Sequence, residues 1–276
     1  MMHKYTAALA ASQGARSHQE DAAALWPGPA TATAPFERAG EDGLLVAVLA
    51  DGMGGHAGGA KASRTACTSF LSAFATEAAP LRDRLRTGMM AANRAVALAV
   101  EEDPALNGMG STLIGTAFGP SGLEWVSVGD SPLYLWRRGE LALVNEDHSL
   151  APLLDELARA GRISAEEART DSRRHMLRSA VTGDEIELVD LSHRPLALVP
   201  GDHVLLASDG IHTLQEAEIA RIVAAYASDG PHSVAAALVR SVEGLRDPLQ
   251  DNCTVVVVRV DPANASSDVQ RPLGAG

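Results

Sequence analysis

The 276-residue chain is poor in positive charge, in cysteine and in long apolar runs. Its 23 Lys and Arg residues are outnumbered by 35 Asp and Glu residues, so the formal net charge is −12. This excess argues against electrostatic binding to nucleic acid or to an anionic membrane, because both require clustered cations. The two cysteines, Cys67 and Cys253, are too few for a disulfide scaffold. We expect both to be small buried thiols of a cytoplasmic protein.

No segment of the sequence is suited to crossing a bilayer. The longest uncharged stretch, 104–123, has about the length of a spanning helix but is polar and rich in glycine. Residues 1–15 faintly imitate a signal peptide, yet their apolar part is short, and 4–11 is better explained as a first β-strand. The sequence therefore favours a protein that is neither exported nor bound to a membrane.

Short apolar strands and amphipathic helices make up the rest of the chain. With 46% hydrophobic residues and neither a repeat nor a linker, residues 1–261 are predicted to form one domain, followed by a disordered tail over 262–276. The residue pattern predicts strands over 4–11, 44–50, 203–210 and 251–260, hairpins over 111–145, a turn-rich surface loop over 26–43, and helices over 59–78, 82–102, 215–226 and 231–245. Strands that follow strands directly argue against an all-parallel sheet, and we predict an α+β domain in which helices cover antiparallel sheets.

Aspartates recur where predicted strands begin or end. The set comprises Asp21, Asp51, Asp130, Asp209 and Asp251. An unpaired carboxylate buried at such a position costs several kcal/mol, so several of them on different strands suggest one shared site. Carboxylates without histidine or thiolate partners favour Mg²⁺ or Mn²⁺, and less so Ca²⁺. Arg16 lies nearby in sequence, and an arginine beside such a centre suggests a bound phosphate.

The glycine-rich turn over 51–61 allows three explanations. It matches a dinucleotide-binding pattern, but Asp51 would repel a pyrophosphate and the surrounding chain lacks βαβ alternation. A P-loop is excluded because Ala60 and Lys61 stand where Lys and Ser or Thr are required. In the third explanation the glycines let the backbone pass close to a metal, with the Gly52 carbonyl as a ligand beside Asp51.

Six short motifs occur in the order, and nearly the spacing, of one family. They are RSHQED (16–21), LADGMGGHAGG (49–59), GMGSTL (108–113), VSVGDSPLYL (126–135), ASDG (207–210) and DNCTVVVV (251–258). On these motifs the chain resembles the metal-dependent PP2C-type (PPM) serine/threonine protein phosphatases in their compact bacterial form. The resemblance extends over about residues 4–260. It implies a four-layer α-β-β-α sandwich of two antiparallel sheets flanked by helices.

The resemblance also implies a mechanism and roles for individual residues. Phosphoserine and phosphothreonine would be hydrolysed by a water held between two Mg²⁺ or Mn²⁺ ions, without a phosphoenzyme. Asp51 would bridge the ions, and the Gly52 carbonyl would complete one coordination sphere. Asp209 and Asp251 would bind the other ion, directly or through water. Arg16 would bind the substrate phosphate.

Other matched positions have supporting roles in the family. Asp21, with Glu20 beside it, would hold metal-bound waters. Asp130 resembles the aspartate that, together with Asp209, can hold a third ion in bacterial members. The segment 149–178 matches the flap beside the active site, which is variable and linked to substrate choice.

Four positions depart from the family pattern or leave a role open. Met53 stands where many eukaryotic members have a histidine as a candidate general acid, so protonation of the leaving group is unassigned. His56 is nearby, and a structural role suits it better than a catalytic one. Gln19 replaces a common asparagine. His175 lies where some bacterial relatives place a serine near the third metal, a departure that bears on the third ion and not on the first two.

Three hypotheses follow, with the phosphatase first. The phosphatase would act in the cytoplasm as a monomer on phosphoserine and phosphothreonine proteins. Its expected partners are a Ser/Thr kinase and the substrates of that kinase. The second is a catalytically silent phosphoprotein-binding signalling module on the same fold. The third is a relative restricted to one regulator, such as an anti-sigma antagonist. The full aspartate set argues against the silent module.

Overall fold

Two antiparallel sheets form the centre of the molecule. The computed structural model describes residues 4–27, 37–39, 44–54 and 57–262. One sheet has the order β10-β9-β12-β13-β1-β3 and the other β11-β8-β7-β4-β2. The first contains β1 (Lys4–Ser12), β3 (Glu37–Ala39), β9 (Leu133–Arg137), β10 (Glu140–Leu143), β12 (His203–Ala207) and β13 (Cys253–Asp261). The second contains β2 (Ala22–Trp26), β4 (Leu45–Ala50), β7 (Leu113–Gly119), β8 (Gly122–Val128) and β11 (Asp190–Leu191). A small third pair joins β5 (Gly52–Met53) to β6 (Gly110–Ser111).

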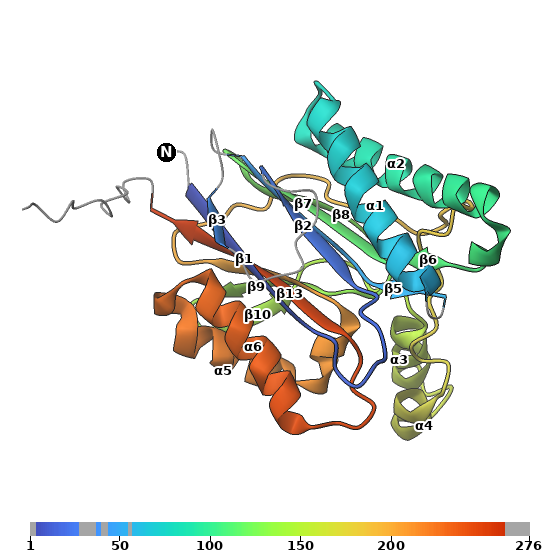
Figure 1. The fold of residues 1–276 in the computed structure, drawn as a ribbon. Helices are drawn as coiled ribbons and strands as arrows, with labels where there is room; N and C mark the ends of the chain where they lie inside the picture. Colours follow the sequence, from blue (N-terminus) through green and yellow to red (C-terminus); the bar gives the residue numbers. More distant parts are fainter. Residues whose placement is uncertain (1–3, 28–36, 40–43, 55–56, 263–276) are drawn as a thin grey trace, which may run out of the picture.

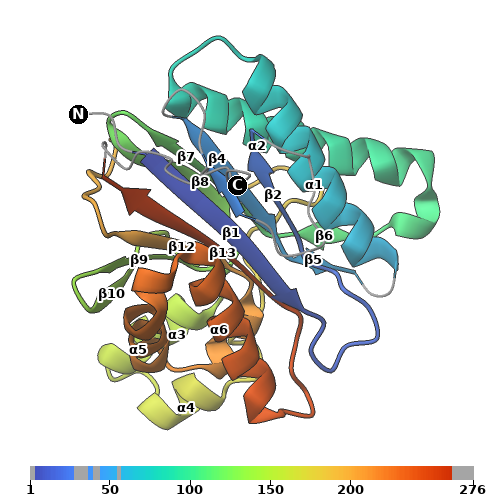
Figure 2. The same ribbon diagram turned by 60° about the vertical axis from the view of Figure 1, so that its left-hand side comes forward.

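Helices cover the outer face of each sheet, so that the molecule has four layers (Figure 1). Helices α1 (Ala57–Thr76) and α2 (Leu81–Glu102) pack on the five-stranded sheet. Helices α5 (Glu216–Tyr226) and α6 (Pro231–Leu245) pack on the six-stranded sheet. The turned view in Figure 2 shows β1 and β13 between the two helix pairs. The α+β class and the four-layer α-β-β-α sandwich predicted from the sequence are confirmed.

Alternating side chains explain why each sheet is buried on both faces. In β4, Leu45, Ala47 and Leu49 join the core between the sheets, whereas the intervening residues join the core under α1 and α2. Both faces of this strand are therefore apolar, which is why it appears in the sequence as a continuous apolar run. The predicted core residues of α1 pack as expected, since Cys67, Phe70 and Phe74 are fully buried. Cys253 is also a buried free thiol.

A helical excursion interrupts the sandwich between β10 and β12. It contains α3 (Ala151–Arg159) and α4 (Ala165–Thr170), which lie outside the four layers (Figure 1). The backbone N–H of Leu150 donates to the carbonyl of Met176 and closes the base of the excursion. Ser164 and Glu167 form the capping box that their spacing predicts, which explains why α4 begins at Ala165.

Several expectations need correction or lie outside the described residues. The region 26–43 is not loop throughout, because Trp26 ends β2 and β3 pairs with β1 at Thr6–Ala8. A three-residue edge strand has no alternation to detect, and its pairing partner lies about 30 residues away. The expectations for His56 and for the tail from 263 onward lie outside the described residues. Among the helices described, none has both the length and the apolar character needed to cross a membrane.

Candidate active site

Strand pairing brings the five aspartates to one end of the sandwich. In the five-stranded sheet Ala22 pairs with Ala50, so Asp21 and Asp51 are the next residues on neighbouring strands. In the six-stranded sheet Ala207 pairs with Val255, which places Asp209 and Asp251 at the same end. Asp130 follows β8, whose last residue, Val128, pairs with Leu113 at the start of β7. The expected convergence of sheet ends is therefore observed.

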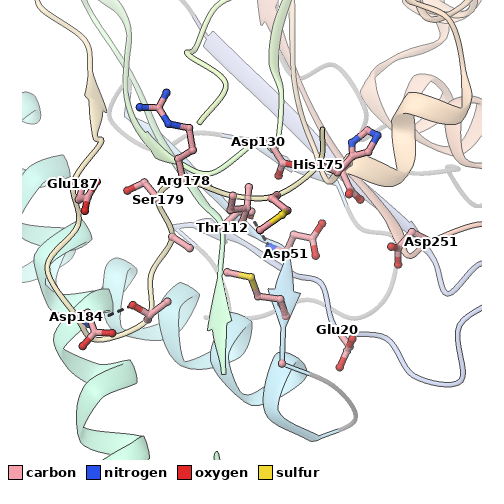
Figure 3. Close-up of a pocket in the computed structure, with 18 of the residues that line it drawn as sticks. Glu20, Asp51, Thr112, Asp130, His175, Arg178, Ser179, Asp184, Glu187 and Asp251 are labelled. Carbon is pink, nitrogen blue, oxygen red and sulfur yellow. Dashed lines mark hydrogen bonds between the residues drawn. The ribbon is translucent and has the colours of Figure 1, made fainter. Parts of the chain in front are cut away.

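A cavity of about 720 Å³ opens at this end of the sandwich. The sequence-predicted residues that line it are Arg16, Glu20, Asp51, Gly52, Asp130, Asp209 and Asp251. Figure 3 shows Asp51 among Asp130, Asp251 and Glu20, with Asp184 and Glu187 on the opposite wall. Asp21 is the exception among the predicted residues, because it lies buried behind the lining.

Hydroxyl groups hold the backbone of Asp51 in place. Its N–H donates to Thr112 Oγ1 at 3.0 Å, and its carbonyl accepts from Ser111 Oγ at 2.8 Å and from the Thr112 N–H at 2.9 Å. Thr112 Oγ1 also contacts Ser131 Oγ at 2.7 Å. Because the backbone is satisfied in this way, the Asp51 carboxylate is left to face the cavity.

Asn252 ties the N-terminal loop to the start of β13. Its Oδ1 accepts from the Glu20 N–H at 2.8 Å, and its Nδ2 donates to the carbonyls of Gln13 (2.8 Å) and His18 (3.0 Å). Ser208 forms a second link, donating to Asp21 Oδ2 at 2.8 Å and accepting from the Thr254 N–H. These side chains position the acidic residues without lining the cavity themselves.

Gly52 sits where the backbone of three segments meets. A Cβ at this position would lie 2.1 Å from the Gly59 carbonyl oxygen and 2.6 Å from that of Glu20, so only glycine fits. The turn thus serves a close approach between backbone segments, and the Gly52 carbonyl as a metal ligand stays a prediction. Since β4 pairs only with antiparallel neighbours, the dinucleotide-binding explanation is excluded.

Arg16 forms an ion pair with one member of the acidic cluster. Its Nη2 forms an ion pair with Asp251 Oδ2, and its side chain is 54% exposed at the rim of the cavity. The hydrogen bond to Asp251 raises the pKa of Arg16 above its already high ordinary value. The guanidinium is thus permanently charged and accessible to an anion in the cavity.

Burial and mutual repulsion disfavour ionisation of the carboxyl groups. Burial is the main cause in every case; it raises the pKa of Asp21 and of Asp130 to about 7. The pKa of Asp51 is raised well above its usual range by burial and by the charges of Asp21 and Asp209. Burial and the charge of Asp251 raise the pKa of Asp209 as well. Such a cluster is stabilised in its ionised form only by added positive charge.

The donor set fits a hard divalent cation. In the part of the chain that the structure describes, three buried carboxylate oxygens have no hydrogen-bond partner: Glu20 Oε1, Asp21 Oδ1 and Asp209 Oδ1. Within the described residues, no three His, Cys, Asp or Glu side chains are close enough to form a ready set of direct ligands. Carboxylates spaced this way suit ions that keep several of their waters, as Mg²⁺ commonly does.

The wall opposite Asp51 is formed by residues 175–187, which extend beyond the predicted flap. His175 lines the cavity, as do Arg178 and Ser179 (Figure 3). The Arg178 guanidinium is directed away from Asp51 in the same view. Asn93 of α2 holds this wall, accepting from the Gly183 N–H at 2.9 Å and donating to the Asp184 carbonyl at 2.7 Å.

Sequence reasoning missed the supporting residues and half of this wall. Thr112, Ser208 and Asn252 belong to the recognised motifs, but no role was predicted for them. The available signal was that each of these polar residues lies next to the apolar run of a predicted strand. The lining by Asp184, Glu185 and Glu187 had no comparable signal, because exposed acids on a loop are ordinary.

Comparisons with known proteins agree with this geometry. A family model described as protein phosphatase 2C matches residues 34–239. The serine/threonine protein phosphatase PstP of Mycobacterium tuberculosis is 38% identical over 61% of this chain, but the match spans only 32% of its own length. A putative 2C-type protein phosphatase of Streptococcus pyogenes is 31% identical over 83% of this chain and 89% of its own. The solved catalytic domain of PstP in complex with two manganese ions has a TM-score of 0.66 at 29% identity, covering 94% of this chain and all of that one.

Proposed function

Because the chain belongs to the protein phosphatase 2C family, we propose that it is a metal-dependent protein serine/threonine phosphatase. Its substrates would be phosphoserine and phosphothreonine in proteins. The observation that carries this proposal is the set of partnerless, buried oxygens of Glu20, Asp21 and Asp209 beside a cavity with Arg16 at its rim. Oxygen donors attract Mg²⁺ or Mn²⁺, and the arginine suits a phosphate dianion.

Two ions would be held by the acidic cluster. Asp51 and the Gly52 carbonyl are proposed as ligands of the first ion, with Asp51 shared by the second. Asp209 and Asp251 would complete the second site, and Asp21 with Glu20 would orient the water shell. When bound, such ions activate a water for attack on phosphorus and offset the developing negative charge. Asp130 is proposed to take part in a third site.

This chain's own residues would place the phosphate for attack. The exposed Arg16 guanidinium donates two parallel hydrogen bonds to phosphoryl oxygens, while its ion pair with Asp251 holds it at the rim. Thr112, Ser111 and Ser131 keep Asp51 oriented, so that little rearrangement is needed when substrate arrives. The retained aspartates argue against a catalytically silent binding module, because such a module has no use for them.

The proposal extends to the protein's setting and its partners. Two buried free thiols, for which burial raises the pKa in each case, agree with a reducing cytoplasm. A Ser/Thr kinase would supply the phosphoproteins on which this protein acts. We further propose that residues 1–261 work as one domain and as a monomer, with 149–178 as a flap.

Hydrolysis of a phosphothreonine peptide and of p-nitrophenyl phosphate tests the proposal. We expect turnover with Mn²⁺, none with EDTA, and about a 100-fold or greater loss of kcat/KM in Asp209→Asn. Arg16→Ala should lower kcat/KM about 10- to 100-fold, with partial recovery in Arg16→Lys because the charge but not the bidentate geometry is kept. Asp103→Asn, a change at an exposed residue that does not line the cavity, is the control. Turnover that persists in EDTA or in Asp209→Asn would refute the assignment.

A further inference from the structure

A second cavity, here called the α2 groove, lies beside the candidate active site. It has a volume of about 950 Å³ and is mainly apolar. Met89, Met90 and Ala97 of α2 line one side, and Ile186, Val189 and Leu191 line the other. Met90 is 67% exposed and Val189 46% exposed, whereas Ile186 and Leu191 pack against the core below. The groove thus offers exposed apolar surface on a fixed apolar floor.

A single segment of the chain, residues 182–187, separates the α2 groove from the catalytic cavity. Within a single stretch of chain, Thr182, Asp184, Glu185 and Glu187 line the catalytic cavity, and Gly183 and Ile186 line the groove. Neighbouring Cα atoms are only about 3.8 Å apart, so the two hollows share a wall. Figure 3 shows Asp184 and Glu187 on this wall, across the cavity from Asp251 and Glu20.

The shared wall is fixed by hydrogen bonds and carries three acidic side chains. The Asn93 side chain hydrogen-bonds to the backbone of both Gly183 and Asp184. In the described part of the chain, the carboxylates of Asp184, Glu185 and Glu187 make no ion pair with any Lys, Arg or His. Any chain that crosses this wall from the catalytic cavity to the groove must pass these three acids.

We propose that the α2 groove and its acidic wall form a docking site for the phosphoprotein substrate, an inference that rests on the proposed phosphatase function. The occupant is an extended segment of the substrate. Its phosphorylated residue lies in the catalytic cavity, a Lys or Arg faces Glu185 and Glu187, and a Leu-, Ile- or Met-sized side chain fills the groove. At about 3.3 Å per extended residue, crossing the wall takes roughly three to five residues. Continuity with the catalytic cavity and charge complementarity favour this occupant over a second copy of the acidic chain.

The site selects among substrates without taking part in the chemistry. Burying a large aliphatic side chain in a preformed apolar groove favours the complex, and the unpaired acids favour a basic neighbour over an acidic one. A small aryl phosphate reaches neither feature, so its turnover reports on the catalytic centre alone. This separation makes failure of the docking proposal distinguishable from failure of the proposed function.

The apolar part is tested with Met90→Lys and Val189→Lys, using Leu98→Lys as the matched control. Leu98 is 45% exposed on the same helix but does not line the groove. The substrates are p-nitrophenyl phosphate and two phosphothreonine peptides. In the first peptide, Arg stands two residues before and two residues after the phosphothreonine, and Leu stands four residues before and four residues after it. The second peptide has Ser in place of each Leu. All assays contain Mn²⁺.

We expect the Leu peptide to be hydrolysed with about tenfold higher kcat/KM than the Ser peptide by the unmodified protein. Met90→Lys and Val189→Lys should abolish this preference, leaving p-nitrophenyl phosphate turnover unchanged, and Leu98→Lys should change nothing. The same preference in all four proteins would overturn the proposal. So would an equal loss on all substrates, or a concentration-dependent dimer that Met90→Lys dissociates, since a second copy would then occupy the groove.

The acidic part is tested by charge reversal. Two peptides are compared, the Arg-containing peptide and the same peptide with Glu in place of Arg. The ratio of their kcat/KM values, Arg peptide over Glu peptide, should fall about tenfold or more in the double variant Glu185→Lys/Glu187→Lys. Taking the ratio cancels any general effect on the nearby catalytic centre. An unchanged ratio would overturn the assignment of these acids to substrate recognition.

Discussion

At the scale of single residues, the buried side chain of Asn252 helps to position the acidic residues of the proposed site. Asn252 makes three hydrogen bonds that join the start of β13 to the N-terminal loop carrying Arg16 and Glu20. It is buried, with 4% of its surface exposed. The amide therefore sets the distance between groups that lie far apart in sequence and belong to one proposed site.

Asn252→Ala should weaken both the fold and the site. Losing the amide removes the partner of the Glu20 N–H and of two carbonyls. A buried group left unsatisfied costs about 1–3 kcal/mol, but Gln13 and His18 are exposed, so water can replace part of the loss at their carbonyls. We expect the free energy of unfolding in urea to fall by about 2–4 kcal/mol, and kcat/KM to fall at temperatures where the variant is still folded. Asn107→Ala is the control, because Asn107 is exposed. Equal stability of the two variants would contradict the role given to Asn252.

At the scale of elements, the sequence patterns predicted the helices and the longer strands well. Helix α1 was recognisable from Cys67, Phe70 and Phe74 at helical spacing, and β4 from its apolar run, because burial of these faces dictates residue type. The strands β3, β5, β6 and β11 contain only two or three residues. Such elements exist because a neighbouring strand offers hydrogen bonds, and their own residues carry no period to detect.

Packing of α1 on its sheet depends on a glycine that sequence reasoning passed over. A Cβ at Gly115 of β7 would lie 2.1 Å from Phe70 Cζ, so the ring occupies the space that a side chain would need. Gly115→Ala should lower the free energy of unfolding by about 1–3 kcal/mol through overpacking. Adding Phe70→Leu should recover part of this loss, which a double-mutant cycle in urea would measure.

Gly244→Ala provides a control of opposite sign for this prediction. A Cβ there meets nothing within 4 Å, and Gly244 lies in α6. Alanine should stabilise the protein by about 0.5 kcal/mol through helix propensity. Strictly additive effects of Gly115→Ala and Phe70→Leu would show that the ring and the glycine are not coupled.

At the scale of the whole molecule, the concentration of acid at one end makes stability depend on pH and on cations. Asp21 and Asp130 have a pKa of about 7 in the folded protein, above the ordinary value near 4. The metal-free folded state therefore binds more protons than the unfolded state between about pH 4 and 7. The contribution of these two groups to stability is therefore fully present below about pH 4 and is lost as the pH rises to about 7.

Divalent cations should reverse this loss, because they bind the ionised carboxylates. The difference in Tm between protein in saturating Mg²⁺ and protein in EDTA should be larger at pH 8.0 than at pH 5.5. Burial lowers the pKa of His148, His203 and His212, so these groups make the protein more stable as the pH rises. Their effect is the same with Mg²⁺ and with EDTA, so it cancels in the Tm difference. Calorimetry with and without Mg²⁺ measures the difference. A Tm difference that is constant or smaller at pH 8.0 would contradict the raised pKa values.

The sequence by itself determined the fold class, the buried faces and the residue types of the proposed metal site. It could do so because apolar periodicity reports burial, and because several carboxylates at the ends of different buried strands suggest one shared cation site. Only the tertiary structure decided that Asp21 lies behind the cavity lining, that Asn252 and Ser208 hold the cluster together, and that residues 182–187 separate two hollows. These properties depend on which segments become neighbours when distant strands pair, and no local pattern of residues encodes that.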